Sequence, residues 1–232
     1  MLSSKKLKAL QKYIDIIELN KGKALGEIFK SIPGDAHKHF KKGASGLIIE
    51  NLLGLENSGS PKADLEYLKV EIKVLPINLS NLKAKEPTQI KMINYMEVIH
   101  ETWESATIRD KIETIFWVVY GVNKTNGKFD PQTKYILLDW FIDVPEGETQ
   151  KIFQKDWEEI VDLVKRGKAE ELSCSMGVYI EPKTKGKNHL DVRDAPDVRG
   201  GVTKARRRAF YFKKNYTNSK IISQLDLQRK KK

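Results

Sequence analysis

Three residues whose side chains could do chemistry together lie close to one another in the chain: Asp64, Glu71 and Lys73. Residues 68–75 alternate in hydropathy, which predicts a strand with Glu71 and Lys73 on one face and Asp64 at its entry. Hydrolysis of a phosphodiester needs a divalent cation, which prefers carboxylate oxygens, and a positive charge near the attacking water. The pattern indicates a metal-dependent nuclease; the alternative is an exposed strand with a weakly paired Glu and Lys.

A third acidic residue, Glu50, lies in the otherwise apolar segment 43–53 (GASGLIIENLL), which predicts a helix closed by Gly54, with Lys42 at its start. An acid on an apolar helix is costly to bury unless it binds a cation or a partner. Glu50 is therefore a candidate third carboxylate.

The elements that must position these residues predict one mixed α/β domain over residues 1–232. We expect helices at residues 4–17, between Gly22 and Pro33, and at 43–53, 103–113 and 148–165. Strands are expected at residues 68–75, 90–96, 115–120 and 135–142, with the pair Asn126-Gly127 connecting the last two, and around Phe210. The polar stretch 181–204 is too long for a simple connection, which is typical of a functional or disordered loop.

Charge is distributed unevenly along the chain. Residues 1–182 carry 26 Lys and Arg against 27 Asp and Glu, whereas residues 183–232 carry 16 against 4. This asymmetry indicates a polyanion partner, because basic side chains that neutralise phosphates release condensed counterions. At the end of the chain, RKKK, the alternative is a solvated basic tail.

Length and composition exclude several other classes of protein. The chain has 232 residues, of which 40% are hydrophobic, enough for a large core. No run approaches the roughly 18 apolar residues of a membrane span, and the start of the chain lacks the apolar stretch of a signal peptide. A single cysteine excludes an intramolecular disulfide. We therefore expect no membrane partner and a location in the bacterial cytoplasm.

The chain resembles the catalytic half of the MutH endonuclease family in residues 42–50 (KGASGLIIE), at Gly54 and Asp64, and in residues 70–73 (VEIK). This family groups the mismatch-repair nicking enzyme with the Sau-type restriction endonucleases that cut at GATC. Further motifs follow in the family's order: residues 23–27 (KALGE), 102–111 (TWESATIRDK), 156–159 (DWEE) and 209–217 (AFYFKKNYT). The resemblance implies a restriction-endonuclease-like PD-(D/E)xK core, in which helices flank a mixed central sheet and two lobes form a DNA-binding cleft.

The resemblance also implies a role for each catalytic residue. Asp64 and Glu71 would bind the metal, Glu50 would support the metal site, and Lys73 would position or activate the water. Lys42 and Lys111 would lie close to the scissile phosphate. We expect Mg²⁺ as the cofactor, with Mn²⁺ able to replace it and Ca²⁺ able to bind without supporting cleavage.

By the same resemblance, residues 1–120 form a catalytic lobe, residues 121–225 a lobe that reads DNA, and residues 226–232 a basic tail. A loop corresponding to residues 177–187 would enter the major groove. The family's Arg-Pro pair is replaced there by Glu181 and Pro182, and an acid can accept from cytosine N4 but cannot donate to guanine O6 and N7. The residues expected to bind DNA are Pro182, Lys183, Lys185, Lys187, Arg206, Arg207, Arg208, Tyr211 (near the methylated adenine), Lys213 and Lys214.

Three functions fit the resemblance. The main expectation is a type II restriction enzyme that cuts double-stranded DNA on the 5′ side of the G in GATC, forming a transient homodimer on its palindromic site. The alternatives are a mismatch-repair nicking enzyme at hemimethylated GATC, which would need the MutL partner, and a DNA-binding module without catalysis. The presence of all four residues Glu50, Asp64, Glu71 and Lys73 argues against the inactive module.

Overall fold

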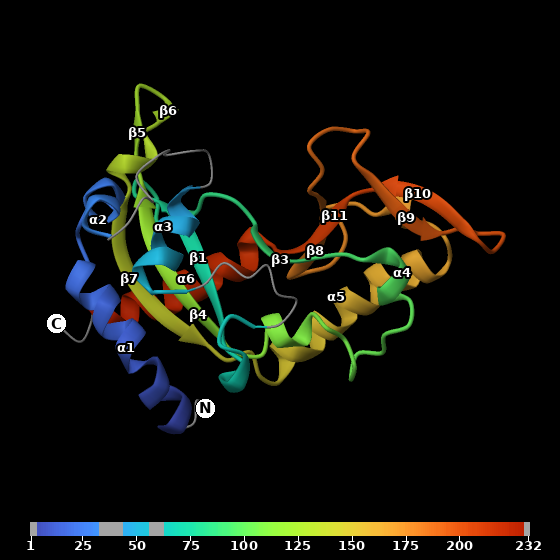
Figure 1. Ribbon diagram of the computed structural model, residues 1–232, viewed down its shortest axis with the longest axis horizontal. Helices are drawn as coiled ribbons and strands as arrows, with labels where there is room; N and C mark the ends of the chain where they lie inside the picture. Colours follow the sequence, from blue (N-terminus) through green and yellow to red (C-terminus); the bar gives the residue numbers. More distant parts are fainter. Residues whose placement is uncertain (1–3, 33–43, 56–62, 230–232) are drawn as a thin grey trace. The chain divides into compact units, whose positions relative to one another are not determined.

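A computed structural model describes residues 4–32, 44–55 and 63–229 (Figure 1). The chain divides by its contacts into two units. The first unit comprises residues 1–86, 114–144 and 218–232, and the second comprises residues 87–113 and 145–217. The units interleave along the chain, whereas the expected lobes follow one another with a boundary near residue 120. The cleft expected between two lobes stays a prediction.

The first unit is built on a mixed four-stranded sheet. Its strands are β2 (Lys83–Ala84), β1 (Glu71–Asn78), β4 (Ile115–Val122) and β7 (Ile136–Asp143), in that spatial order. Strand β1 runs parallel to β4, and the other pairs are antiparallel. All eight residues of β4 are buried, as the central position of this apolar strand requires. The expected mixed sheet is therefore confirmed.

A short hairpin connects β4 to the rest of the unit. Its strands are β5 (Lys124–Thr125) and β6 (Lys128–Phe129). The two residues between them, Asn126 and Gly127, both have positive φ, of 51° and 76°. Asn-Gly is the pair that such a two-residue turn prefers, so the predicted connection is confirmed.

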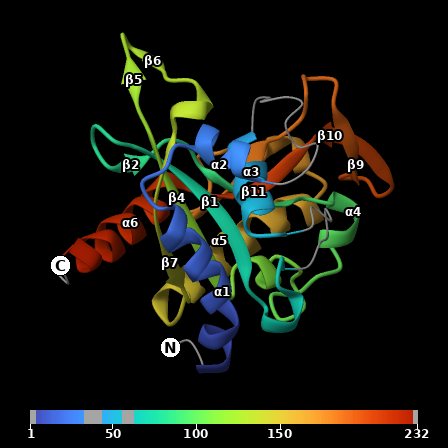
Figure 2. The same cartoon turned by 60° about the vertical axis from the view of Figure 1, so that its left-hand side comes forward.

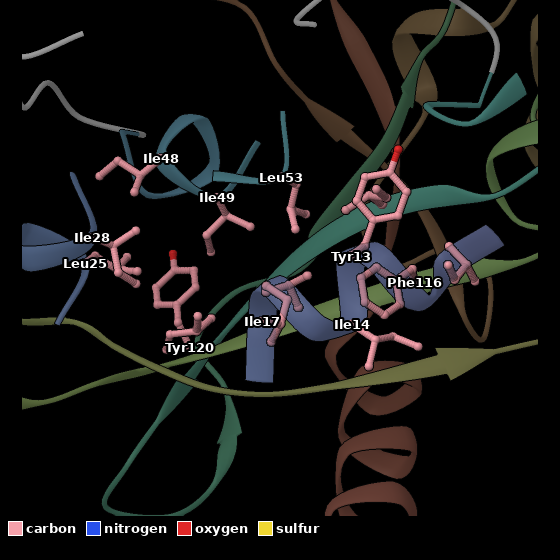
Figure 3. Packing of buried hydrophobic residues seen from close by; sticks show 14 of the residues in the cluster. Tyr13, Ile14, Ile17, Leu25, Ile28, Ile48, Ile49, Leu53, Phe116 and Tyr120 are labelled. Carbon is pink, nitrogen blue, oxygen red and sulfur yellow. The ribbon is translucent and has the colours of Figure 1, made fainter. Parts of the chain in front are cut away.

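Three helices cover the sheet of the first unit and form its core with it: α1 (Ser4–Asn20), α2 (Leu25–Ser31) and α3 (Ala44–Leu52). Figure 3 shows Ile17 of α1, Ile28 of α2 and Ile49 of α3 among the buried side chains that pack with Phe116 and Tyr120 of β4. In Figure 2, α1 lies across the strands β1 and β4. Helical spacing in the sequence predicted the apolar face of α1 at Leu10, Ile14 and Ile17, but was wrong at Leu7, which is exposed.

The last helix, α6 (Lys214–Arg229), contributes its part from Asn218 onward to the first unit. Asn218 accepts a hydrogen bond from the backbone of Ala84 in β2, at 2.7 Å. The ammonium of Lys220 lies 2.9 Å from the buried carboxylate of Asp143 in β7. Helices therefore flank the sheet as expected, and residues 226–229 of the predicted tail belong to a helix.

The second unit contains an antiparallel sheet with the order β3 (Thr88–Met92), β11 (Arg208–Phe212), β8 (Ile180–Thr184). Helix α5 (Glu148–Lys165) packs against this sheet, with the ring of Phe153 at 5.7 Å from that of Phe212. A two-stranded ribbon, β9 (Val192–Pro196) and β10 (Val202–Arg206), and the short helix α4 (Tyr95–Val98) complete the unit with several single-turn 3-10 helices. No helix in the described ranges combines the length and apolar character of a membrane span.

Three expectations about local structure are wrong. The strand expected at residues 90–96 ends at Met92, because the side chain of Asn94 accepts a hydrogen bond from Met96 and begins helix α4. The helix expected at 103–113 is a series of turns with one 3-10 turn, Arg109–Lys111; Ser105 binds the backbone of Thr102 there and competes with a helix. The stretch 181–204 is neither disordered nor a simple loop, since it contains most of β8, all of β9 and the start of β10.

Candidate active site

Asp64 and Glu71 are brought together by a tight loop in the first unit. Leu65 and Val70 form an isolated antiparallel bridge, in which each backbone N–H donates to the other residue's carbonyl, at 3.0 and 3.3 Å. The chain between them makes one 3-10 turn and reverses through Lys69, which has a left-handed φ of 51°. The spacing of seven residues therefore places both carboxylates at the start of β1.

The two carboxylates are oriented by reciprocal hydrogen bonds. The backbone N–H of Asp64 donates to Glu71 Oε2 at 3.3 Å, and the backbone N–H of Ile72 donates to Asp64 Oδ2 at 2.8 Å. Lys73 Nζ lies 2.6 Å from Glu71 Oε1, and the Glu71 side chain is only 2% exposed. A buried carboxylate needs such a partner. The predicted face of β1 that carries Glu71 and Lys73 is thus confirmed in its geometry.

Glu50 belongs electrostatically to the same group. It lies in the last turns of α3 and is partly buried. Burial raises the pKa of Glu50, and the nearby carboxylates of Asp64 and Glu71 raise it further, whereas the ammonium of Lys73 lowers it. Of the catalytic candidates in this unit, the structure therefore brings together Glu50, Asp64, Glu71 and Lys73.

The donor set of this cluster fits a hard divalent cation. Three carboxylates, of Glu50, Asp64 and Glu71, act on one another together with a single ammonium, so the ionised group carries excess negative charge. Carboxylate oxygens are the ligands that Mg²⁺ and Mn²⁺ take. Among the described residues, no three His, Cys, Asp or Glu side chains are placed close enough together to hold a metal ion, so the carboxylates here fit the cation by their chemistry and not as a formed three-ligand site. Asp64 and Glu71 are the pair that would hold the ion, with Glu50 beside them.

Lys42 and Lys111 are the two remaining candidates for catalysis. Lys42 is outside the described residues. Lys111 is buried in the 3-10 turn of the second unit. Its charge acts on Lys91 of β3. Burial lowers the pKa of Lys91, the carboxylate of Glu101 raises it, and the charge of Lys111 lowers it. Lys111 therefore belongs to a partly buried basic pair.

Four of the basic residues expected to bind DNA are engaged within the second unit. Arg206 donates to the carboxylate of Glu170 through its backbone, at 2.8 Å, and its side chain, at 2.5 Å. Arg208 is buried and donates to the Glu170 carbonyl at 3.2 Å. Arg207 Nη1 lies 3.8 Å from Asp191, and Lys213 Nζ donates to the carbonyl of Gly177 at 2.7 Å. These contacts give the four side chains structural roles in the unit.

Of the other residues of the expected DNA-binding set, four lie on or just after the edge strand β8, whereas Tyr211 lies on β11 and Lys214 begins α6. Lys183 lies over the ring of Tyr211, with Nζ at 5.7 Å from the ring centroid, and Pro182 is buried. Three lysines are exposed to solvent: Lys185, Lys187 and Lys214. These are the side chains that phosphates can reach.

Two acidic residues of the second unit, Asp156 in the motif 156–159 and Glu181 beside Pro182, were given no structural role from the sequence. Asp156 of α5 is buried and accepts hydrogen bonds from three consecutive backbone N–H groups, of Val178, Tyr179 and Ile180, at 2.6–2.8 Å. It therefore fixes the start of β8. Glu181 follows on β8 and is also buried. No spacing in the sequence could signal Asp156, because its partners are backbone groups 22 to 24 residues away.

Comparisons with known proteins find one family and several relatives. The family described as "DNA mismatch repair enzyme MutH" matches residues 53–156, a range that includes Asp64, Glu71, Lys73 and Lys111. Among the relatives, the DNA mismatch repair protein MutH of Klebsiella pneumoniae is 28% identical over 209 residues, covering 89% of this chain and 88% of its own length. The protein of that name from Haemophilus ducreyi is 26% identical and covers 84% of this chain and 85% of its own length. The one from Escherichia coli is 27% identical and covers 81% of this chain and 80% of its own length. The chain is thus similar to the MutH family of endonucleases, through the family match and through relatives that cover most of its length.

Proposed function

We propose that this protein is a divalent-metal-dependent endonuclease that nicks double-stranded DNA at GATC during mismatch repair. Its class, a site-specific endonuclease, follows from the family. The observation that carries the rest is the group Glu50, Asp64, Glu71 and Lys73 at one end of β1, in a chain whose relatives are named as mismatch repair proteins. Action on chromosomal DNA places the protein in the bacterial cytoplasm.

The residues at the start of β1 divide the work of phosphodiester hydrolysis. A bound Mg²⁺ would stabilise the additional negative charge on the phosphate in the transition state and lower the pKa of the attacking water. Asp64 and Glu71 hold this cation, and their backbone hydrogen bonds fix the direction of both carboxylates. Lys73, held by Glu71, presents its ammonium where it can orient the water or a phosphate oxygen. Glu50 adds negative charge behind the metal ligands.

DNA is bound through the second unit in this proposal. Lys183, Lys185, Lys187 and Lys214 contact phosphates, since their ammonium groups are partly or fully exposed. Tyr211 and Pro182 lie on neighbouring strands of the same sheet, at the place where the reading of bases is expected. Arg208 is left out of the DNA contacts because its side chain is buried within the unit.

The comparisons favour mismatch repair over restriction. The main expectation from the sequence, a type II restriction endonuclease, is not confirmed, whereas the mismatch-repair alternative fits the relatives better. Nicking of one strand requires a single catalytic group and no homodimer on the palindrome. It also implies a partner of the MutL type, which activates the nuclease after a mismatch is found.

Incubation of the purified protein with Mg²⁺ and supercoiled plasmid tests this proposal. The plasmid is supplied in unmethylated, hemimethylated and fully adenine-methylated forms, with and without MutL, and the ends are mapped by sequencing. We expect nicked circles with ends at GATC in unmethylated strands, formed faster when MutL is present. Linear product at GATC without a partner would support restriction instead, and binding to GATC without any cleavage would overturn the proposal.

A further inference from the structure

A short hairpin of the first unit carries two lysines that converge on one aromatic ring. The hairpin, formed by β5 and β6, projects from the end of β4 (Figure 1). Nζ of Lys124 lies 4.6 Å from the centroid of the Phe129 ring, and Nζ of Lys85, which follows β2, lies 4.5 Å from it. The two ammonium groups are therefore at most about 9 Å apart and repel each other. We call Lys85, Lys124 and Phe129 the hairpin face.

The backbone holds the hairpin face together. Lys124 pairs directly with Phe129 in the register of β5 and β6, so the two side chains share one face of the hairpin. Lys85 is anchored to the main sheet of the unit, because its backbone N–H donates to the carbonyl of Pro76 in β1 at 2.8 Å. The hairpin face thus joins two segments of the chain that the fold brings side by side.

The charges of the hairpin face indicate its partner. An aromatic ring attracts an ammonium group but offers it no oxygen acceptor, so N–H groups of both lysines can donate to an anion. Phe129 is 43% exposed and Lys124 is exposed, so a ligand can reach them. Residues 83–86 and 123–135 carry five lysines against two acids, although basic and acidic side chains nearly balance over residues 1–182. A local excess of lysines around an exposed ring fits a nucleic-acid backbone better than a protein surface.

Strand β4 sets the distance between the hairpin face and the candidate catalytic group. It runs parallel to β1, and its first residue, Ile115, pairs with Glu71. Lys124 follows Ile115 by nine residues, which corresponds to about 25–30 Å along the sheet, at about 3.3 Å per residue. Duplex DNA rises about 3.4 Å per base pair, so a duplex that follows the sheet meets the hairpin about 7–9 base pairs from the cleaved bond.

We propose that the hairpin face binds backbone phosphates of the DNA that flanks the recognition site, whatever the base sequence of this flank. The inference rests on the proposed function, in that it requires the first unit to hold a duplex at Glu71. The contact lies beyond the four base pairs of GATC. It positions the duplex on the catalytic group without reading bases, because phosphate contacts fix the register of a protein on DNA and carry no sequence information.

The salt dependence of binding tests the charges of the hairpin face. The affinity for a long duplex with GATC at its centre is measured in Ca²⁺ over a series of salt concentrations. For the double variant Lys85→Gln, Lys124→Gln, we expect the slope of log affinity against log salt to be smaller than for the wild type by about 1.8, about 0.9 for each phosphate contact. The double variant Lys85→Arg, Lys124→Arg keeps both charges and should keep the wild-type slope. Equal slopes for the wild type and the glutamine variant would overturn the inference.

Lys128→Gln is the matched control on the same hairpin. Lys128 is exposed and pairs with Thr125, so its side chain points to the face opposite Lys124. Its substitution should leave the slope unchanged. A slope reduced as much by Lys128→Gln as by Lys124→Gln alone would overturn the assignment to the hairpin face.

A series of duplexes tests the position of the contact. The flank on each side of GATC is lengthened one base pair at a time, and the affinity is measured in Ca²⁺. We expect the affinity of the wild type to rise as the flank passes about 7–9 base pairs, and the glutamine variant to show no rise there. A rise of the same size in both proteins, or no rise in the wild type, would overturn the inference.

The two proposals can fail separately in these measurements. A protein that shows the rise with flank length, but never cuts GATC in Mg²⁺, would contradict the proposed nuclease and leave the hairpin contact supported. A protein that cuts at GATC, with the same salt slope and the same flank dependence in the wild type and the glutamine variant, would support the nuclease and contradict the hairpin contact.

Discussion

The substitution Asp156→Asn tests how β8, the strand that carries Glu181, is held in place. In the native protein Oδ1 of Asp156 accepts from the N–H of Val178, and Oδ2 accepts from those of Tyr179 and Ile180. The side chain is 1% exposed, so water does not replace a lost acceptor. An asparagine has one acceptor oxygen, and its amide NH₂ would face at least one backbone N–H as donor against donor.

The size of the effect follows from these three bonds. A hydrogen bond to a charged group contributes about 1.5–3 kcal/mol, and a buried donor left without an acceptor costs about 1–3 kcal/mol. Losing one bond and weakening the other two should lower the free energy of unfolding by about 3 kcal/mol. Gly177, directly before these donors, has a φ of +67°, and a β-carbon added there would overlap the Ile180 carbonyl oxygen, so the turn before β8 is tight.

Urea denaturation followed by circular dichroism measures this difference. Asp162→Asn is the matched control on the same helix: Asp162 is exposed and pairs with Arg166 one turn away, at 2.6 Å. A surface pair of this kind contributes at most about 0.5 kcal/mol. If Asp156→Asn lowered the stability by less than about 1 kcal/mol, the backbone hydrogen bonds would not be what fixes the start of β8.

Two further predictions concern the first unit. Lys73→Met removes the ammonium beside the buried Glu71. We expect the rate of single-turnover cleavage to fall by at least about 100-fold, and the free energy of unfolding to fall by about 3 kcal/mol. Cleavage at the wild-type rate would exclude Lys73 from the reaction. Burial raises the pKa of Tyr120 to about 12, so the native state keeps a proton that the unfolded chain releases near pH 10. The contribution of this proton to the free energy of unfolding is complete below pH 10 and is lost between pH 10 and about 12, by about 3 kcal/mol. Urea denaturation of wild type and of Tyr120→Phe across this pH range should show a smaller loss of stability in the variant. Equal losses would contradict the assignment.

The sequence predicted most accurately those parts that depend on local pattern. The helical spacing of Leu7, Leu10, Ile14 and Ile17 predicts the buried face of α1 at all positions but Leu7, which lies in the exposed first turns. Residues 148–165 form α5 as expected. The alternation along residues 68–75 predicts the face of β1 that carries Glu71. These features follow from periodicity within one element, which the chain carries on its own.

Features that depend on distant partners could not be predicted in this way. Asp156 accepts hydrogen bonds from three backbone N–H groups, and Arg206 forms an ion pair with Glu170. Both interactions join residues that are far apart in sequence. Residues 181–204 are polar and rich in Gly and Pro, yet β8 forms because β11 pairs with it. Tertiary pairing thus overrides weak local propensity.

The central claim is tested most directly with an end-labelled duplex that carries one unmethylated GATC site. Wild type and Glu71→Gln are each incubated with it in Mg²⁺, and the rate of cleavage is measured. Glu71→Gln keeps the size of the side chain and removes the negative charge that the metal requires. We expect the wild type to cut only with the divalent metal, and the variant to cut at least about 100-fold more slowly while it binds the duplex in Ca²⁺ within about threefold of the wild type. Cutting by Glu71→Gln at the wild-type rate, or cutting by the wild type in EDTA, would contradict a metal-dependent nuclease built on Asp64, Glu71 and Lys73.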